Sequence, residues 1–165
     1  MTLSDFKAKL NWRLILVHIA ACWFFFHAFR ILSQLYDLPF VEAIKHSSNM
    51  KQFGAERITY DALWFSLGGN IGILVAFVLS LIASKIRHWY WVNSLLAFLL
   101  ACLLCRFDFA WHYLKIIFLT PGDLFHTLLW QLITNGSIML AIGLLLLFLN
   151  GVARFIDGRK KVEVE

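Results

Sequence analysis

Four long apolar stretches alternate with polar segments along the chain. Each stretch is close to the ~20 residues that an α-helix needs to cross the hydrocarbon core of a bilayer. The pattern therefore predicts an all-α membrane protein with four transmembrane helices in an up-down-up-down bundle. The predicted spans cover residues 14–35, 62–84, 89–108 and 132–152, and together they form a single domain over residues 1–165.

The polar segments between the spans differ in length. Residues 36–61 are predicted to form an outer loop, either a solvated connector or a cap over the bundle, and Asp37 followed by Pro39 predicts a short helix within it. Helices 3 and 4 are predicted to extend beyond the bilayer through an outer extension over residues 109–131. Thr120 and Pro121 suit the N-cap and first position of the fourth helix, which is expected to continue to Phe155.

The composition supports lipid as the solvent for much of this chain. Hydrophobic residues make up 61% of it and charged residues only 15%, whereas a soluble domain carries about 25% charged residues. A cleaved signal peptide is the rival interpretation of the first span. It is disfavoured because the apolar stretch before Cys22 contains His18 and continues beyond the cysteine as Trp23 and Phe24.

The distribution of basic residues predicts the orientation in the membrane. The net charge is +5, but Lys and Arg lie at span ends and no nucleic-acid-binding motif is present, so no nucleic-acid partner is expected. With both termini cytoplasmic, the inner side holds nine Lys and Arg, against six outside, as the positive-inside rule requires. We expect an integral protein of a bacterial inner (cytoplasmic) membrane. The inner residues are Lys7, Lys9, Arg13, Lys85, Arg87, Arg154, Arg159, Lys160 and Lys161, and the outer ones are Arg30, Lys45, Lys51, Arg57, Arg106 and Lys115.

At matched depths, ionisable residues of all four helices fall near the outer interface. Charged side chains at hydrocarbon depth are costly and face the bundle interior or a wet cavity. We therefore predict an ion pair between Arg30 and Asp108. The cluster forms either an interfacial layer solvated by water and headgroups, or a cavity that binds an ion, a lipid headgroup or a small solute. Its members are His27, Arg30, Asp61, Arg106, Asp108, His112, Asp123 and His126.

Two polar stripes follow the helical spacing of one turn. Ser66 and Asn70 lie on the second span, among glycines that favour close helix packing. Thr127, Gln131 and Asn135 lie on the fourth helix. Both stripes fit helix–helix contacts, and the alternative is that they line a path for a solute.

Residues Cys102 and Cys105 form a CxxC motif near the end of the third span. In its length, its four spans and this motif the chain resembles membrane thiol oxidases of the vitamin K epoxide reductase type, which pass electrons from thiols to quinone. Those enzymes carry a second cysteine pair on an outer loop, and this chain has none there. Cys105, Asp108 and His112 share one helix face and are the candidate metal ligands.

The sequence contains no complete catalytic signature, such as a phosphate-binding glycine loop, a zinc-protease pair or a nucleophile elbow. No cofactor is predicted. We expect a non-catalytic accessory or structural subunit that assembles with itself or with other membrane subunits in the lipid bilayer. One alternative is a channel or transport component lined by the polar stripes. The other is a membrane thiol-redox, metal or haem protein that uses the face of Cys105, Asp108 and His112.

Overall fold

The computed structural model describes residues 9–47, 49–105 and 125–158. Within these ranges every regular element is a helix, so the all-α class predicted from the apolar pattern is confirmed. The elements are α2 (Trp12–Ser33), η1 (Gln34–Asp37), α3 (Leu38–His46), η2 (Met50–Phe53), α4 (Ala55–Ile86), α5 (Val92–Leu104), α7 (Leu128–Phe148) and α8 (Asn150–Ile156).

Three helical stretches are long and apolar enough to cross a membrane, which supports an integral membrane protein. They are the stretch Trp12–His46, which joins α2, η1 and α3, together with α4 and α7. α5 is apolar as well, but its 13 residues reach only about 20 Å, less than the ~30 Å of hydrocarbon. The last residues of the predicted third span, 106–108, lie outside the described residues. A four-span bundle therefore stays a prediction.

The predicted outer loop over residues 36–61 is largely helical, which corrects the expectation of a loop. The short helix expected after Asp37 is confirmed as α3, with Pro39 in its first turn. α4 begins at Ala55 rather than at residue 62. An apolar run shows only which part of a helix lies in lipid. Polar residues such as Glu56 and Arg57 are good helix formers, so the helix extends beyond the apolar run.

The prediction that the fourth helix continues without a break to Phe155 is wrong. α7 ends at Phe148, Leu149 is extended with φ −65° and ψ 129°, and α8 begins at Asn150. The guanidinium of Arg87 stabilises this break, because its Nη2 donates to the carbonyl oxygen of Phe148 at 3.0 Å and to Asn150 Oδ1 at 2.9 Å. A carbonyl released from the helix thus keeps a hydrogen bond. Most of the predicted outer extension, including Thr120 and Pro121, lies outside the described residues.

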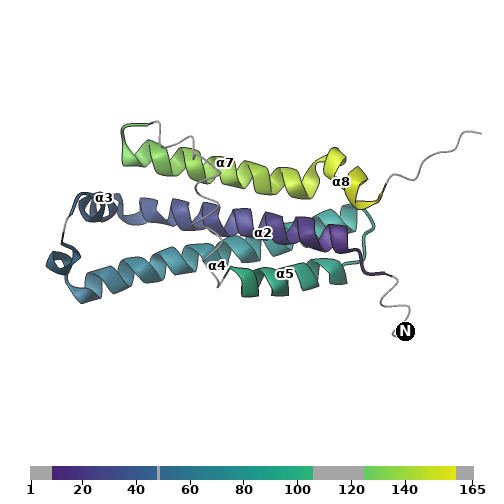
Figure 1. Cartoon of the computed structure of the whole chain (residues 1–165), viewed down its shortest axis with the longest axis horizontal. Coiled ribbons are helices and arrows are strands. Elements are labelled where there is room, and N and C mark those ends of the chain that lie inside the picture. Colours follow the sequence, from purple (N-terminus) through teal and green to yellow (C-terminus); the bar gives the residue numbers. More distant parts are fainter. Residues whose placement is uncertain (1–8, 48, 106–124, 159–165) are drawn as a thin grey trace, which may run out of the picture.

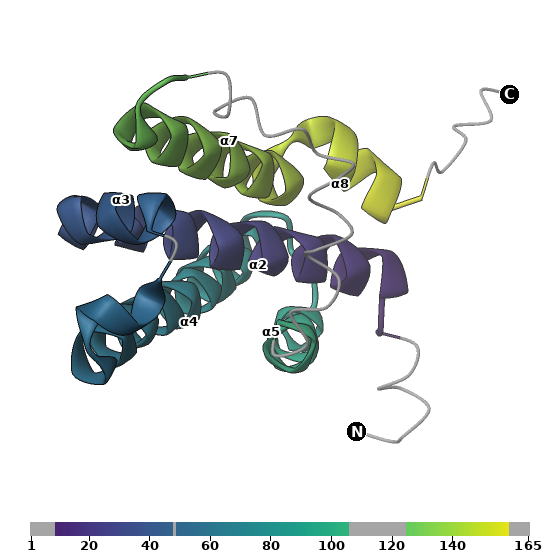
Figure 2. The same cartoon turned by 60° about the vertical axis from the view of Figure 1, so that its left-hand side comes forward.

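Helix α2 lies at the centre of the molecule and packs against α4, α5 and α7 (Figures 1 and 2). Its buried residues recur every three or four positions from Leu14 to Phe26. The largest core cluster combines Cys22 and Phe25 of α2 with small residues of α4 and α5 and with Leu147 of α7. Helix α2 therefore takes part in most of the helix–helix packing, although α4 also contacts α5 directly through the stacked rings of Phe77 and Phe98.

Glycines allow α4 and α7 to approach α2 closely. A Cβ on Gly72 would collide with the carbonyl oxygen of Phe25, and one on Gly68 would come within 2.8 Å of the carbonyl oxygen of Phe29. On α7, a Cβ on Gly143 would lie 2.6 Å from the ring of Phe25. Close packing of small residues drives helix association in lipid, so the small-residue contact predicted for the second span is confirmed at α2.

Two asparagines hold together the end at which the described chain starts and stops. Asn11 caps α2, since its Oδ1 accepts from the N–H groups of Arg13 at 3.1 Å and Leu14 at 3.2 Å, and its Nδ2 donates to the carbonyl oxygen of Ile156 at 3.2 Å. Buried Asn93 of α5 accepts the N–H of Asn11 at 3.0 Å. The first and last described helices therefore meet at one end of the molecule (Figure 1).

Candidate binding pocket

Five of the residues singled out in the sequence line one pocket of about 370 Å³ between α2, α4 and α5. They are Arg30, Ser66, Asn70, Cys102 and Cys105, and Phe26 and Ile73 complete the lining. The sequence placed these residues in separate groups, namely an outer cluster, a polar stripe, the CxxC motif and a candidate metal face. The packing of three helices brings them together.

The side chain of Arg30 supplies the positive charge of this pocket. Arg30 lies in the last turn of α2, where a cation interacts favourably with the carbonyl end of the helix. Its guanidinium lies 4.1 Å from the ring centre of Phe65 and 5.0 Å from that of Phe26. Both aromatic faces attract the cation and restrict its side chain. The charge is therefore held at a fixed place in the wall.

The hydroxyl of Ser66 and the amide of Asn70 lie one turn apart, near the middle of α4. Both residues are exposed. Neither side chain makes a hydrogen bond within the described part of the chain, whereas the buried hydroxyls of Ser80, Ser84 and Ser94 are all bonded. An amide that faces hydrocarbon without a partner is costly. These two groups are thus available to a ligand or to another helix.

Sulfur atoms form another part of the pocket. Cys102 and Cys105 both line it, and Cys22 is buried in the core beside it, with Phe25 and Ala101. None of the three cysteines is in a disulfide. Within the described ranges no group of three His, Cys, Asp or Glu side chains is placed to hold a metal ion.

Three further predicted residues lie among the described residues but do not line this pocket. His27 is buried and its ring packs edge-on against Trp23 and Phe26 at 4.5 and 5.0 Å. Asp61 lies half-buried on α4, and His126 is exposed before α7. Arg106, Asp108, His112 and Asp123 lie outside the described residues. The pair of Arg30 with Asp108 and the face of Cys105, Asp108 and His112 therefore stay predictions.

The two polar stripes do not share a surface. The stripe of the fourth helix lies on and just before α7, where Thr127 is exposed, Asn135 is half-buried, and Gln131 accepts a hydrogen bond from Lys45 Nζ at 2.8 Å. The Ser66 and Asn70 stripe lies on α4. Figure 2 shows α2 between α4 and α7. No residue of α7 lines the pocket among the described residues.

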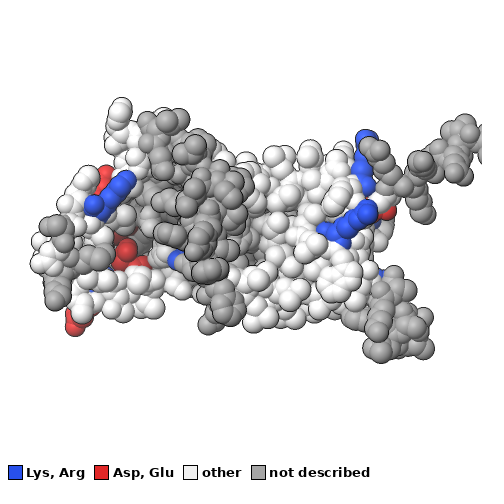
Figure 3. Space-filling model, in the orientation of Figure 1, with Lys and Arg blue, Asp and Glu red and all other residues white. Residues whose placement is uncertain are grey.

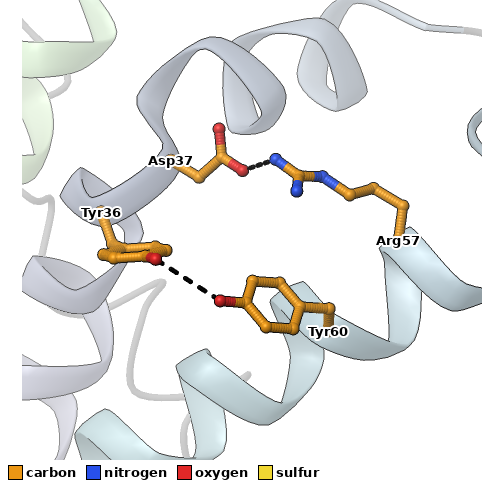
Figure 4. Close-up of polar contacts among 4 residues, drawn as sticks. All are labelled: Tyr36, Asp37, Arg57 and Tyr60. Atoms are coloured by element: carbon orange, nitrogen blue, oxygen red, sulfur yellow. Dashed lines mark hydrogen bonds and ion pairs between the residues drawn. The ribbon is translucent and has the colours of Figure 1, made fainter.

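A second, more open pocket of about 630 Å³ lies where η1 meets the start of α4. Figure 4 shows its two cross-connections, an ion pair between Asp37 and Arg57 and a contact of 3.4 Å between the hydroxyls of Tyr36 and Tyr60. Tyr36 also stacks on Trp64 with 4.6 Å between the ring centres. These contacts fix the turn from α2 to α4, and sequence reasoning found none of them.

A buried hydrogen-bond network around His18 was also missed. His18 Nδ1 lies 2.6 Å from Ser80 Oγ and 3.3 Å from Ser94 Oγ, and Ser94 Oγ lies 2.8 Å from Ser84 Oγ. All four side chains are at most 1% exposed. The signal available in the sequence was His18 and three serines, all inside apolar runs.

Comparisons of the chain with protein-family models, with curated proteins and with solved structures found no match.

Proposed function

We propose that the chain is a non-catalytic integral membrane protein that works by assembly, as an accessory or structural subunit, with itself or with other membrane subunits. One observation carries this proposal: Ser66 and Asn70 are exposed and unbonded, within the described residues, near the middle of a 32-residue apolar helix. Lipid tails offer such groups no hydrogen bond, whereas a neighbouring helix does.

The surroundings of the polar pair favour a helix as the partner. Leu63, Leu67 and Ile71 are 63%, 46% and 41% exposed on the same helix. They flank Ser66 and Asn70 with apolar surface on the side away from Arg30, so the patch resembles a transmembrane helix contact with polar residues at its edge. A second helix packed along this patch would cover the Asn70 amide. Because the amide faces lipid rather than water, no hydrogen bond to water would be lost.

The test compares Asn70→Leu with the wild type in liposomes, with energy transfer between two differently labelled copies measured at decreasing protein-to-lipid ratio. An interhelical hydrogen bond is worth ~1–2 kcal/mol in model helices, so association should weaken about 5- to 30-fold. Ser137→Leu is the matched control, because Ser137 is exposed on α7, away from the patch. It should leave association unchanged.

The Asn70→Leu variant also distinguishes an assembled protein from one that is monomeric in lipid. If Asn70 faced only hydrocarbon, leucine would be the better residue there, and the variant would be more stable with no change in association. Co-purification from native membranes in mild detergent covers the case of a different partner subunit. A strictly monomeric protein with no companion in that preparation contradicts the proposal.

The CxxC residues support a second candidate, a membrane thiol-redox function. Cys102 and Cys105 both line the pocket beside Arg30, and Cys105 caps the end of α5, where the helix is least constrained. Alkylation of membranes with and without prior reduction, followed by mass measurement, counts the oxidised thiols. An absorbance spectrum with metal analysis tests the haem and metal alternatives. If the alkylation experiment found both thiols fully reduced in cells grown aerobically, a redox role would be contradicted.

A channel or transport function is less well supported. It needs Ser66 and Asn70 on one path with Gln131 and Asn135, and α2 lies between the two helices that carry them (Figure 2). Such a path would have to form between copies of the chain. Flux measured in liposomes that contain the assembled oligomer tests this candidate.

A further inference from the structure

An open pocket of about 520 Å³ lies where the start of α2 meets the end of α8. Lys9, Trp12 and Arg13 form one side of it and Asp157 and Gly158 the other. The pocket is far from the one lined by Arg30, since it lies at the end of the molecule where the described chain starts and stops (Figure 1). It has no part in the proposed assembly through α4.

Aromatic rings and one backbone carbonyl position the two cations of this pocket. Lys9 Nζ lies 5.7 Å from the ring centre of Tyr90, and the Arg13 guanidinium lies 5.4 Å from that of Phe155. Arg13 Nη1 also donates to the carbonyl oxygen of Phe155 at 3.2 Å. Gly158 leaves room for this guanidinium, since a Cβ there would come within 3.3 Å of Nη1.

Neither cation is neutralised by an acidic side chain in the part of the chain that the structure describes. Both are exposed. Asp157, the acidic residue of the pocket, accepts a hydrogen bond from Trp89 Nε1 at 2.8 Å instead. Two positive charges therefore face one opening with their donors directed by packing rather than by an ion pair.

The charge around the pocket is strongly unequal between the two ends of the molecule. Among the described residues, the pocket end carries five cations and one acid, which are Lys9, Arg13, Lys85, Arg87, Arg154 and Asp157. The opposite end carries four acids, Asp37, Glu42, Glu56 and Asp61, besides its cations. Figure 3 shows mostly Lys and Arg at the pocket end and both signs of charge at the other. The pocket end attracts anions.

Exposed aromatic residues place the pocket at the depth of lipid headgroups. Trp12, Trp91 and Phe155 are 64%, 56% and 59% exposed at this end, and tryptophan is enriched at the membrane–water interface. Leu16, one turn after Trp12 on α2, is also 64% exposed. Trp12 and Leu16 thus form an exposed apolar strip that runs from the two cations toward the middle of the molecule, and an acyl chain can lie against such a strip.

We propose that this pocket binds the phosphate headgroup of an anionic phospholipid, with Lys9 and Arg13 on the phosphate and the acyl chain along Trp12 and Leu16. Charge selects an anionic lipid over a zwitterionic one, because the end as a whole has excess positive charge. The apolar strip selects a lipid over a free phosphate ester, which would gain only the polar contacts.

The test measures binding of phosphatidylglycerol to the full chain in neutral detergent by native mass spectrometry. Phosphatidylcholine with the same acyl chains and free glycerol phosphate are the comparison ligands. Each cation near a membrane surface is worth ~1 kcal/mol, equivalent to about fivefold in affinity. Lys9→Gln and Arg13→Gln should therefore each weaken phosphatidylglycerol binding about fivefold, and phosphatidylcholine and glycerol phosphate should bind at least tenfold more weakly than phosphatidylglycerol.

Two matched variants separate the pocket from general surface charge. Lys85→Gln removes an exposed cation at the same end but outside the pocket, and Lys45→Gln removes one at the other end. Neither should change the affinity by more than about twofold, since neither side chain lines the pocket. Equal losses from Lys85→Gln and Arg13→Gln, equal binding of phosphatidylcholine, or equal binding of glycerol phosphate would each overturn the proposal.

Discussion

At the scale of single residues, the His18 network decides how α2, α4 and α5 fit together. Ser80 Oγ lies 2.6 Å from His18 Nδ1, and Ser94 Oγ lies 3.3 Å from the same atom, so two helices compete for one nitrogen of a third. The whole network is excluded from water. His18 Nδ1 and the three serine hydroxyls are thus bonded in the observed register, whereas His18 Nε2 is buried without a partner. Sliding any of the three helices would leave further buried groups unsatisfied.

Ser80→Ala is expected to lower the free energy of unfolding by about 1 kcal/mol, since interhelical hydrogen bonds in membrane proteins average ~0.6 kcal/mol and reach ~1.7 kcal/mol. The loss should be limited because Ser94 remains 3.3 Å away and can approach His18. Adding Ser94→Ala should thus cost more than the two single changes together. Unfolding in mixed micelles measures these values. Ser137→Ala, on an exposed serine of α7, is the control, and an effect equal to that of Ser80→Ala would contradict the role of the network.

The sequence singled out several polar residues but could not assign their neighbours. Arg30 and Asn70 were predicted to belong to different groups, and they line the same pocket. The reason is physical: helical periodicity gives the angle of each side chain about its own helix, but not the rotation of one helix against another. The serines of the His18 network were overlooked because a single serine changes the apolarity of a run very little.

At the scale of elements, the glycines of α4 and α7 set the distance of these helices from α2. The neighbour of Gly72 is the backbone carbonyl of Phe25, which cannot rotate away. The neighbours of Gly143 and Gly136 are side chains of α2, which can adjust. The α2–α4 contact should therefore be the least tolerant of added volume.

Gly72→Ala is expected to destabilise the protein by ~1–3 kcal/mol, the usual range for overpacking a close contact, despite the better helix propensity of alanine. Gly151→Ala is the matched change, because the nearest atom to a Cβ there lies 4.0 Å away. It should be neutral or stabilising by up to ~1 kcal/mol. Thermal unfolding of both variants in the same detergent provides the comparison. Similar losses in the two would show that backbone propensity, rather than the α2–α4 distance, controls stability.

Which segments are helical was predictable, whereas where each helix ends was less so. Apolar runs located α2, α4, α5 and α7 because lipid requires long uninterrupted apolar helices. The break at Leu149 was missed although Asn150 and Gly151, a pair typical of turns, follow it directly. Arg87, which bonds the released carbonyl of Phe148, is distant in sequence and gave no signal. The early start of α4 was missed because its first turns are polar.

At the scale of the whole molecule, both ends of the described chain and the turn between α4 and α5 lie at one end, and α3 and the start of α4 lie at the other (Figure 1). The apolar faces of α2, α4 and α7 extend between these two ends. In a bilayer this arrangement separates Lys9 and Arg154 from Glu56. The excess of positive charge at the first end then predicts that this end is cytoplasmic.

Cysteine labelling in intact cells tests this arrangement. In a background with Cys22, Cys102 and Cys105 replaced by serine, single cysteines are introduced as Lys9→Cys, Arg154→Cys and Glu56→Cys, all at exposed positions. A membrane-impermeant maleimide added from outside should label only Glu56→Cys, because the other two sites lie across the hydrocarbon. Permeabilised cells should label all three, which controls for accessibility. Labelling of Lys9→Cys and Glu56→Cys from the same side would mean that the chain does not cross the bilayer between them. Lys9 and Arg154 on opposite sides would require an odd number of crossings, which contradicts the four-span bundle.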